Sequence, residues 1–216
     1  GYIIIDEQHK FGVRQRKLLS DKGGKNCDVL LMSATPIPRT LTMSIYGDMD
    51  VSIIKEKPNN RKDVKTYSKL ESKIDEIIKF VKNEINFGNQ IFWVCPLIEE
   101  SKKLDHTSSV NKFKLLNKIF PNNVALLHGN VDSVQKEEIL TQFLNKKFSI
   151  LVSTTIIEVG IDFPNANTII IENANKFGLS QLHQLRGRVG RGSKQASCIL
   201  MFKSNLSENA RKRFNI

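Results

Sequence analysis

The chain has 216 residues, of which 40% are hydrophobic, and its 33 Lys and Arg outnumber its 22 Asp and Glu to give a formal net charge of +11. This length allows one sizeable hydrophobic core and part of a second. No apolar run approaches the roughly 18 to 20 residues that a membrane span needs, which argues against a membrane protein. The positive charge suits nucleic acid as a partner, although a sequence this rich in Lys, Asn and Ile also fits an ordinary solvated surface.

The first predicted element is a buried β-strand over residues 2–5, Tyr-Ile-Ile-Ile, and two acids follow it directly. At the end of a buried parallel strand, Asp6 can ligate Mg²⁺ and Glu7 can accept a proton from a water that attacks the γ-phosphate of a nucleotide. A strand that ends in a solvated turn explains the same two acids, so the pattern alone leaves both interpretations open.

The Gly-rich loop that would hold the nucleotide phosphates does not occur in the sequence. The nearest match, Gly23-Gly24-Lys25-Asn26, lacks both the spaced first Gly and the hydroxyl residue that ligates the metal. We therefore expect that loop to precede Gly1.

A short helix is predicted over residues 14–19 and a second buried strand over 28–32. Ser33 and Thr35 lie in the turn after this strand. Small hydroxyl residues at such a position commonly cap the next helix, and that interpretation is adequate for the turn taken alone.

Residues 58–203 are predicted to form one complete domain. A helix over 40–46 and a Pro- and Asn-rich linker over 56–61 precede it. Apolar β-branched runs then alternate with segments of helical period, which predicts an α/β fold with a doubly wound parallel sheet. The predicted strands are 64–67, 90–95, 124–127, 149–152, 168–172 and 197–202. The predicted helices are 72–85, 110–119, 134–143 and 179–185.

Polar segments follow two of these strands. Hydroxyls and backbone N–H groups at a helix start, as at Thr154 and Thr155, can hold a nucleic-acid phosphate, and Asp162 is placed to bind a ribose or to couple to the Arg-rich segment. A simple helix cap explains the two threonines equally well. His128 and Gly129 form a similar candidate, although a lone His at such a position is often only a capped loop residue.

Residues 181–192, Gln-Leu-His-Gln-Leu-Arg-Gly-Arg-Val-Gly-Arg-Gly, interleave Arg with Gly. Each Gly weakens a helix by about 1 kcal/mol, so the segment predicts a tight turn that presents guanidinium groups to phosphate oxygens. We expect Arg188 and Arg191 to reach the γ-phosphate, with Gln184 as an orienting polar group. A basic surface turn is the alternative interpretation.

The cysteines are far apart in the sequence. Cys27, Cys95 and Cys198 belong to no Cys-x-x-Cys pair and have no nearby His, so they predict no metal site. They fit the reduced thiols of a cytoplasmic protein.

Together these segments resemble the superfamily-2 DNA helicases and, more narrowly, the RecG-type ATP-dependent DNA helicases. The segments that carry the resemblance are 6–13, 35–41, 95–101 and 177–192, and the match covers nearly the entire chain. The transcription-repair coupling translocases are the nearest alternative, and Gln8, His183 and residues 95–101 favour the RecG type.

The resemblance implies that both parts of the chain are RecA-like. Residues 1–57 would end the first, ATP-binding domain, 58–203 would form the second, and 204–216 would begin a helical extension. It also implies ATP and Mg²⁺ as cofactors, and branched or duplex DNA as the partner in repair and recombination.

The resemblance assigns roles residue by residue. The implied catalytic residues are Asp6, Glu7, Gln184, Arg188 and Arg191. The implied cofactor-binding residues are Asp6, Gln8, His9, Gly160, Asp162, Arg188 and Arg191, and Asp6 and Glu7 would hold the metal. The implied DNA contacts are Arg39, Thr40, His128, Gly129, Thr154 and Thr155, and Ser33 and Thr35 would couple the two sites.

RecG-type helicases also carry an N-terminal wedge domain and a phosphate-loop segment, which would both precede Gly1. We therefore expect the 216 residues alone to be inactive as an ATPase. A second hypothesis is a non-catalytic remnant that folds and binds nucleic acid weakly. The two hypotheses are distinguished by whether the reading frame of the gene continues upstream of Gly1 and encodes a Gly-Lys-Thr or Gly-Lys-Ser loop there.

Overall fold

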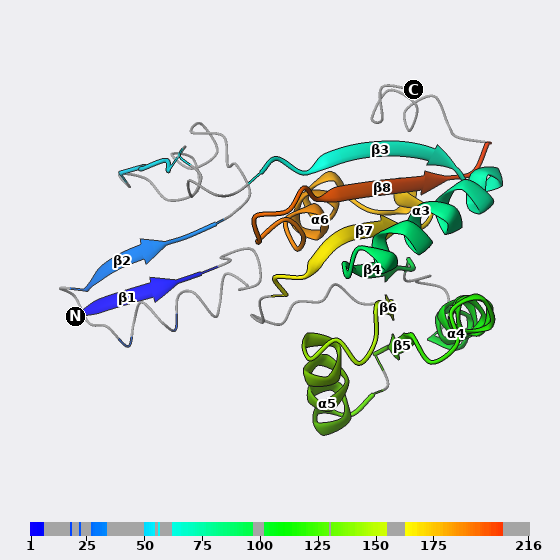
Figure 1. The fold of residues 1–216 in the computed structure, drawn as a ribbon. Helices are drawn as coiled ribbons and strands as arrows, with labels where there is room; N and C mark the ends of the chain where they lie inside the picture. Colours follow the sequence, from blue (N-terminus) through cyan, green and yellow to red (C-terminus); the bar gives the residue numbers. More distant parts are fainter. Residues whose placement is uncertain are drawn as a thin grey trace. The chain divides into compact units, whose positions relative to one another are not determined.

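The computed structural model divides the chain into two compact units, Gly1–Lys55 and Glu56–Ile216 (Figure 1). The structure describes residues 1–6, 18, 22, 27–33, 50–54, 56, 62–96, 102–129, 131–154 and 163–204, with backbone alone over 102–108. Each unit is described by itself.

The first unit contains a parallel pair of strands, β1 (Tyr2–Ile5) and β2 (Asp28–Leu31). The β-branched run of β1 favours an extended backbone, and Ile5 is buried at its end. Both predicted strands are confirmed, the second one residue shorter than expected. The helix predicted over 40–46 lies outside the described residues, as does the helix predicted over 14–19 apart from Leu18, whose backbone is helical.

The second unit contains a six-stranded, all-parallel sheet in the order β3-β8-β7-β4-β6-β5. The strands are β3 (Lys65–Leu70), β4 (Gln90–Val94), β5 (Val124–Leu127), β6 (Ile150–Ser153), β7 (Ala166–Ile171) and β8 (Ser197–Phe202). The helices are α3 (Ile74–Asn86), α4 (Lys102–Ile119), α5 (Ser133–Leu144) and α6 (Leu179–Arg186). The short 3₁₀ turns η2 (Glu71–Lys73) and η3 (Ala174–Lys176) precede α3 and α6.

Helices cover both faces of this sheet. Apolar side chains of α3 and α4, such as Val81 and Leu116, share one core with Trp93 of β4, whereas those of α5 and α6, such as Phe143 and Leu185, share the other. The central strands β4, β6 and β7 are buried along their whole length, which explains their continuous apolar sequence. The predicted doubly wound α/β fold is confirmed.

Several predicted boundaries were wrong, among them the end of the first strand of this unit, because β3 ends at Leu70 rather than at residue 67. Helix α4 begins at Lys102 rather than at residue 110, because its polar first turns lack the apolar spacing that marks a helix in sequence. Strand β7 runs from Ala166 to Ile171, so Glu172 lies just beyond the strand rather than inside it. That shift places a charged residue at the edge of the sheet.

Candidate functional site

The Arg-rich segment lies at the edge of the sheet where the strands begin. Helix α6 brings the chain back from the carboxyl end of β7 to the start of β8, and residues 187–196, here called the Arg turn, join them (Figure 1). The Ala196 carbonyl accepts a hydrogen bond of 3.0 Å from the backbone N–H of Lys65 at the start of β3. This edge is called the amino edge below.

Local interactions determine where α6 starts and stops. The Gln181 side chain accepts a 2.9 Å hydrogen bond from the backbone N–H of Gly178, which caps the first turn. Leu182 and Leu185 are buried against the sheet. At the end of the helix, the N–H of Gly187 donates to the carbonyl of His183. The chain then leaves the helix, and the side chain of Val189 is buried in the core.

Gly190 fixes the shape of the Arg turn. Its φ is +75°, and a Cβ atom there would lie 3.0 Å from the Ala196 Cβ and 3.1 Å from Val64 Cγ2. Only glycine combines this backbone conformation with such close packing. Arg188 and Arg191 flank the buried pair Val189-Gly190 and are therefore held on a constrained backbone.

The structure brings together three of the predicted ATP-site residues in this region. Gln184 lies in the last turn of α6, Arg188 follows the helix, and Arg191 follows Gly190. Gln184 and Arg188 are partly buried and Arg191 is exposed. A guanidinium group remains charged and offers a planar set of donors, so the segment suits phosphate oxygens.

The predicted DNA contacts that the structure describes lie at the opposite, carboxyl edge. Strands β5 and β6 are neighbours, and the backbone N–H of Thr154 donates to the Leu127 carbonyl at 3.4 Å. His128 and Gly129 follow β5 directly. Thr154 is only 4% exposed, whereas His128 is partly buried and Gly129 is exposed, so the last two offer the accessible groups.

In the first unit, Asp6 and Ser33 lie at one edge of the two-stranded sheet. The strands are parallel with Ile5 opposite Leu31, and the N–H of Met32 donates to the Ile5 carbonyl at 2.8 Å. Asp6 and Ser33 follow these paired positions by one and two residues. The edge where these strands end therefore carries a carboxylate and a hydroxyl.

The other predicted site residues lie outside the described residues: Glu7, Gln8, His9, Thr35, Arg39, Thr40, Thr155, Gly160 and Asp162. Among the residues that are described, no group of three or more His, Cys, Asp and Glu could hold a metal ion. No helix in that part of the chain is both long and apolar enough to span a bilayer. The single described metal candidate is thus Asp6, whose hard carboxylate oxygens suit Mg²⁺.

Sequence reasoning missed a buried charged cluster at the carboxyl edge. Oε1 of Glu172 accepts a 2.9 Å hydrogen bond from Trp93 Nε1 and lies 2.6 Å from Lys112 Nζ. The Lys112 ammonium also lies 5.5 Å from the centre of the Trp93 ring. Burial raises the pKa of the adjacent Cys95 thiol, and the Glu172 charge raises it further. The sequence signal for this cluster was a charged residue directly after an apolar strand. It was missed because the predicted strand, 168–172, included Glu172.

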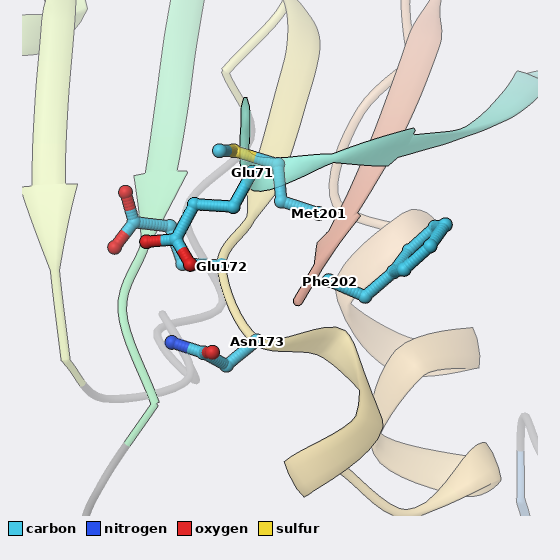
Figure 2. A pocket seen from close by; sticks show the side chains of 5 residues that line it. All are labelled: Glu71, Glu172, Asn173, Met201 and Phe202. Carbon is cyan, nitrogen blue, oxygen red and sulfur yellow. The ribbon is translucent and has the colours of Figure 1, made fainter. Parts of the chain in front are cut away.

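Glu172 also borders a small pocket with Glu71, Asn173, Met201 and Phe202, and Figure 2 shows these five side chains. The pocket leaves no room for a water molecule. Lys112 and Trp93 already engage the Glu172 carboxylate. The cluster therefore acts as a structural link between α4 and the ends of β4 and β7.

Comparison with known proteins shows a helicase relationship. Residues 72–193 match the family described as helicase conserved C-terminal domain. An ATP-dependent DNA helicase RecG of Bacillus subtilis (strain 168) is 49% identical over 216 residues, which are 99% of this chain and 31% of that protein. The RecG of Thermotoga maritima is 48% identical over 215 residues, which are 99% of this chain and 27% of that protein. The chain thus spans a third or less of these relatives.

Solved structures agree. A RecG structure bound to a three-way DNA junction has a TM-score of 0.76 and 42% sequence identity, and the match covers 100% of this chain and 27% of that one. The Mycobacterium smegmatis helicase Lhr bound to ssDNA and AMP-PNP has a TM-score of 0.67 over 94% of this chain and 28% of its own, with 16% identity. At that identity the second likeness shows the fold alone, which is RecA-like.

Proposed function

Because this chain belongs to the helicase conserved C-terminal domain family, we propose that it is a segment of the motor of a RecG-type ATP-dependent DNA helicase that remodels branched DNA in repair and recombination. Residues 58–203 are its second RecA-like domain. Residues 1–57 end the first motor domain, and 204–216 begin a helical extension. The similarity to RecG proteins over nearly the whole chain supports this proposal.

The observation that carries the proposal is the Arg turn on its constrained backbone at the amino edge. Arg188 and Arg191 stabilise the charge that develops on the γ-phosphate, and Gln184 orients the reacting groups. Positioned donors of this kind act without reorganising during the reaction, and for that reason a glycine-fixed turn suits the task.

The Asp-Glu pair supplies the other half of the ATP site. Asp6 anchors Mg²⁺, which neutralises phosphate charge when bound, and Glu7 accepts the proton of the attacking water. The remaining nucleotide contacts in this proposal are Gln8, His9, Gly160 and Asp162.

DNA binds at the carboxyl edge in this proposal. His128, Gly129 and Thr155 contact phosphates in this proposal, through backbone N–H groups and hydroxyls. Thr154, whose side chain is buried and whose N–H donates to the Leu127 carbonyl, holds the backbone that leads to Thr155. Arg39 and Thr40 add contacts from the first motor domain, and Ser33 and Thr35 couple them to the ATP site. Of the proposed residues that the structure describes in the second domain, Arg188 and Arg191 lie at the amino edge, and His128, Gly129 and Thr154 lie at the carboxyl edge.

The test is DNA-stimulated ATP hydrolysis by the full-length product of the gene that encodes this chain. We expect Arg188→Ala and Arg191→Ala each to reduce turnover by about 10³-fold or more. Glu7→Gln, which removes the general base, should reduce it by about 10²- to 10⁴-fold. Arg186→Ala, which removes an arginine of α6 with no assigned role, is the matched control and should retain turnover. A full-length product without DNA-stimulated hydrolysis would contradict the proposal and favour the non-catalytic remnant.

The 216 residues by themselves contain no phosphate-binding loop, and we propose that this segment alone hydrolyses no ATP above background. Purified residues 1–216 and their Glu7→Gln variant are compared with and without DNA. Turnover that responds to DNA and disappears in Glu7→Gln would refute this part of the proposal.

A further inference from the structure

A polar network at the amino edge holds the end of the Arg turn that leads into β8. Lys194 Nζ donates a 2.9 Å hydrogen bond to Asn89 Oδ1 and a longer one of 3.4 Å to the Phe87 carbonyl. Asn167 Nδ2 donates to the same Asn89 oxygen at 3.1 Å. Asn89 and Asn167 are only 8% and 1% exposed, so the Lys194 ammonium reaches a buried amide rather than a solvated surface group.

The network continues to a carboxylate. Asn89 Nδ2 donates to Glu84 Oε2 at 2.9 Å, and the hydroxyl of Thr168 donates to the same oxygen at 3.2 Å. The Asn89 amide therefore turns its oxygen towards the Lys194 cation and its nitrogen towards the Glu84 anion. Both ends of its dipole are favourably oriented, and hydrogen bonds to charged groups in such a chain strengthen one another.

The backbone around Asn89 is itself well defined. Gly88 has a φ of +72°, and its N–H donates to the Ile85 carbonyl at 2.8 Å. The N–H of Asn89 donates to the Glu84 carbonyl at 3.0 Å. This turn between α3 and β4 offers Lys194 a fixed acceptor.

Other contacts attach the Arg turn to the starts of β3 and β7. Gln195 Nε2 donates to the Asp63 carbonyl at 2.6 Å, and a Cβ atom at Gly192 would lie 2.9 Å from the Pro164 carbonyl oxygen. Lys194 adds an attachment to the start of β4. The Arg turn thus contacts the chain near the first residues of three strands, β3, β4 and β7.

We propose that Lys194 and Asn89 are positioning residues for the Arg turn. By fixing the backbone that follows Arg191, they keep Arg188 and Arg191 at the place from which they reach the nucleotide. The inference rests on the proposed ATPase function. It adds two residues that lie outside the sequence segments on which the helicase resemblance is based. Neither residue contacts the nucleotide in this account.

The kinetic test uses the full-length product with Lys194→Met. We expect kcat for DNA-stimulated hydrolysis to fall about 10-fold with less than a twofold change in KM for ATP, because displacement of a catalytic group by a fraction of an ångström weakens the transition state more than the bound substrate. Lys194→Arg keeps a donor and should recover most of the rate. Lys82→Met, an exposed lysine of α3, is the matched control and should behave as wild type.

The structural test is hydrogen exchange of residues 187–196 in the 216-residue chain. We expect Lys194→Met to accelerate exchange in the Arg turn at least threefold while the amides of β4 and β7 keep wild-type rates, as an effect of local opening. Unchanged exchange in the turn, or a loss of kcat equal to that of Lys82→Met, would overturn the positioning role. If the wild-type full-length product lacks turnover, the proposed function fails separately, and exchange alone decides the role of Lys194.

Discussion

Two glycines with the same left-handed backbone, Gly88 and Gly190, differ in what surrounds them. A Cβ atom at Gly88 would meet nothing within 4 Å, whereas one at Gly190 would press on Ala196 and Val64. Gly88→Ala should cost about 1 kcal/mol of unfolding free energy through backbone strain. Gly190→Ala should cost a further 1 to 3 kcal/mol, approximately, through overpacking. Urea unfolding measures the difference, and equal losses for the two variants would contradict the packing argument.

The buried thiols make stability depend on alkaline pH. Burial raises the pKa of Cys198 from 9.0 to about 12, against an opposing effect of the nearby Arg186 charge. Above pH 9 the unfolded thiol loses its proton while the folded thiol keeps it, so the stabilising contribution present below pH 9 is lost as pH rises towards 12.

Wild type should therefore lose unfolding free energy faster than Cys198→Ala, by about 1.4 kcal/mol per pH unit once pH exceeds the unfolded pKa. Urea unfolding at several pH values between about 8 and 10.5 measures the two slopes. Other groups titrate in this range, but they are common to both proteins and cancel in the comparison. Parallel curves would show that burial does not shift this thiol.

At the scale of elements, the two sheets differ in how well they are covered. In β1, Tyr2 and Ile4 are 63% and 57% exposed, and Leu30 of β2 is 40% exposed, whereas β4 and β7 are buried along their whole length. An isolated pair of strands is marginally stable in water. We expect the amides of β1 and β2 to exchange at least 100-fold faster than those of β4 and β7 in the 216-residue chain. Equal protection in a monomer would contradict this.

The helices and strands also show which features of the fold can be predicted from sequence patterns. Strands β4, β6 and β7 were predictable because a strand buried on both faces is a continuous apolar run. The start of α4 was not, since its first turns are polar and lack the apolar spacing that marks a helix in sequence. The role of Glu172 was hidden for a related reason, because its partner Lys112 belongs to another element.

In the second unit as a whole, the strand order and the connections between strands determine at which edge of the sheet each motif lies. The order β3-β8-β7-β4-β6-β5 places the segments after β5 and β6 together at the carboxyl edge, and α6 returns the Arg turn to the amino edge. The described residues that we propose for nucleotide and for DNA in this unit thus lie at opposite edges of one sheet. This arrangement is compatible with the proposed motor, in which nucleotide and DNA are bound at once.

The α/β class, the identity of most strands and helices, and the chemical character of the Arg-rich and Asp-Glu segments could all be predicted from the residues alone. These properties are local, since they follow from apolar periodicity, backbone preference and side-chain chemistry within a few residues. The strand order, the edge at which each segment lies and the hydrogen bond from Lys194 to Asn89, which joins positions 105 residues apart, became visible in the folded chain. Such contacts depend on how distant segments pack, and no pattern of neighbouring residues specifies them.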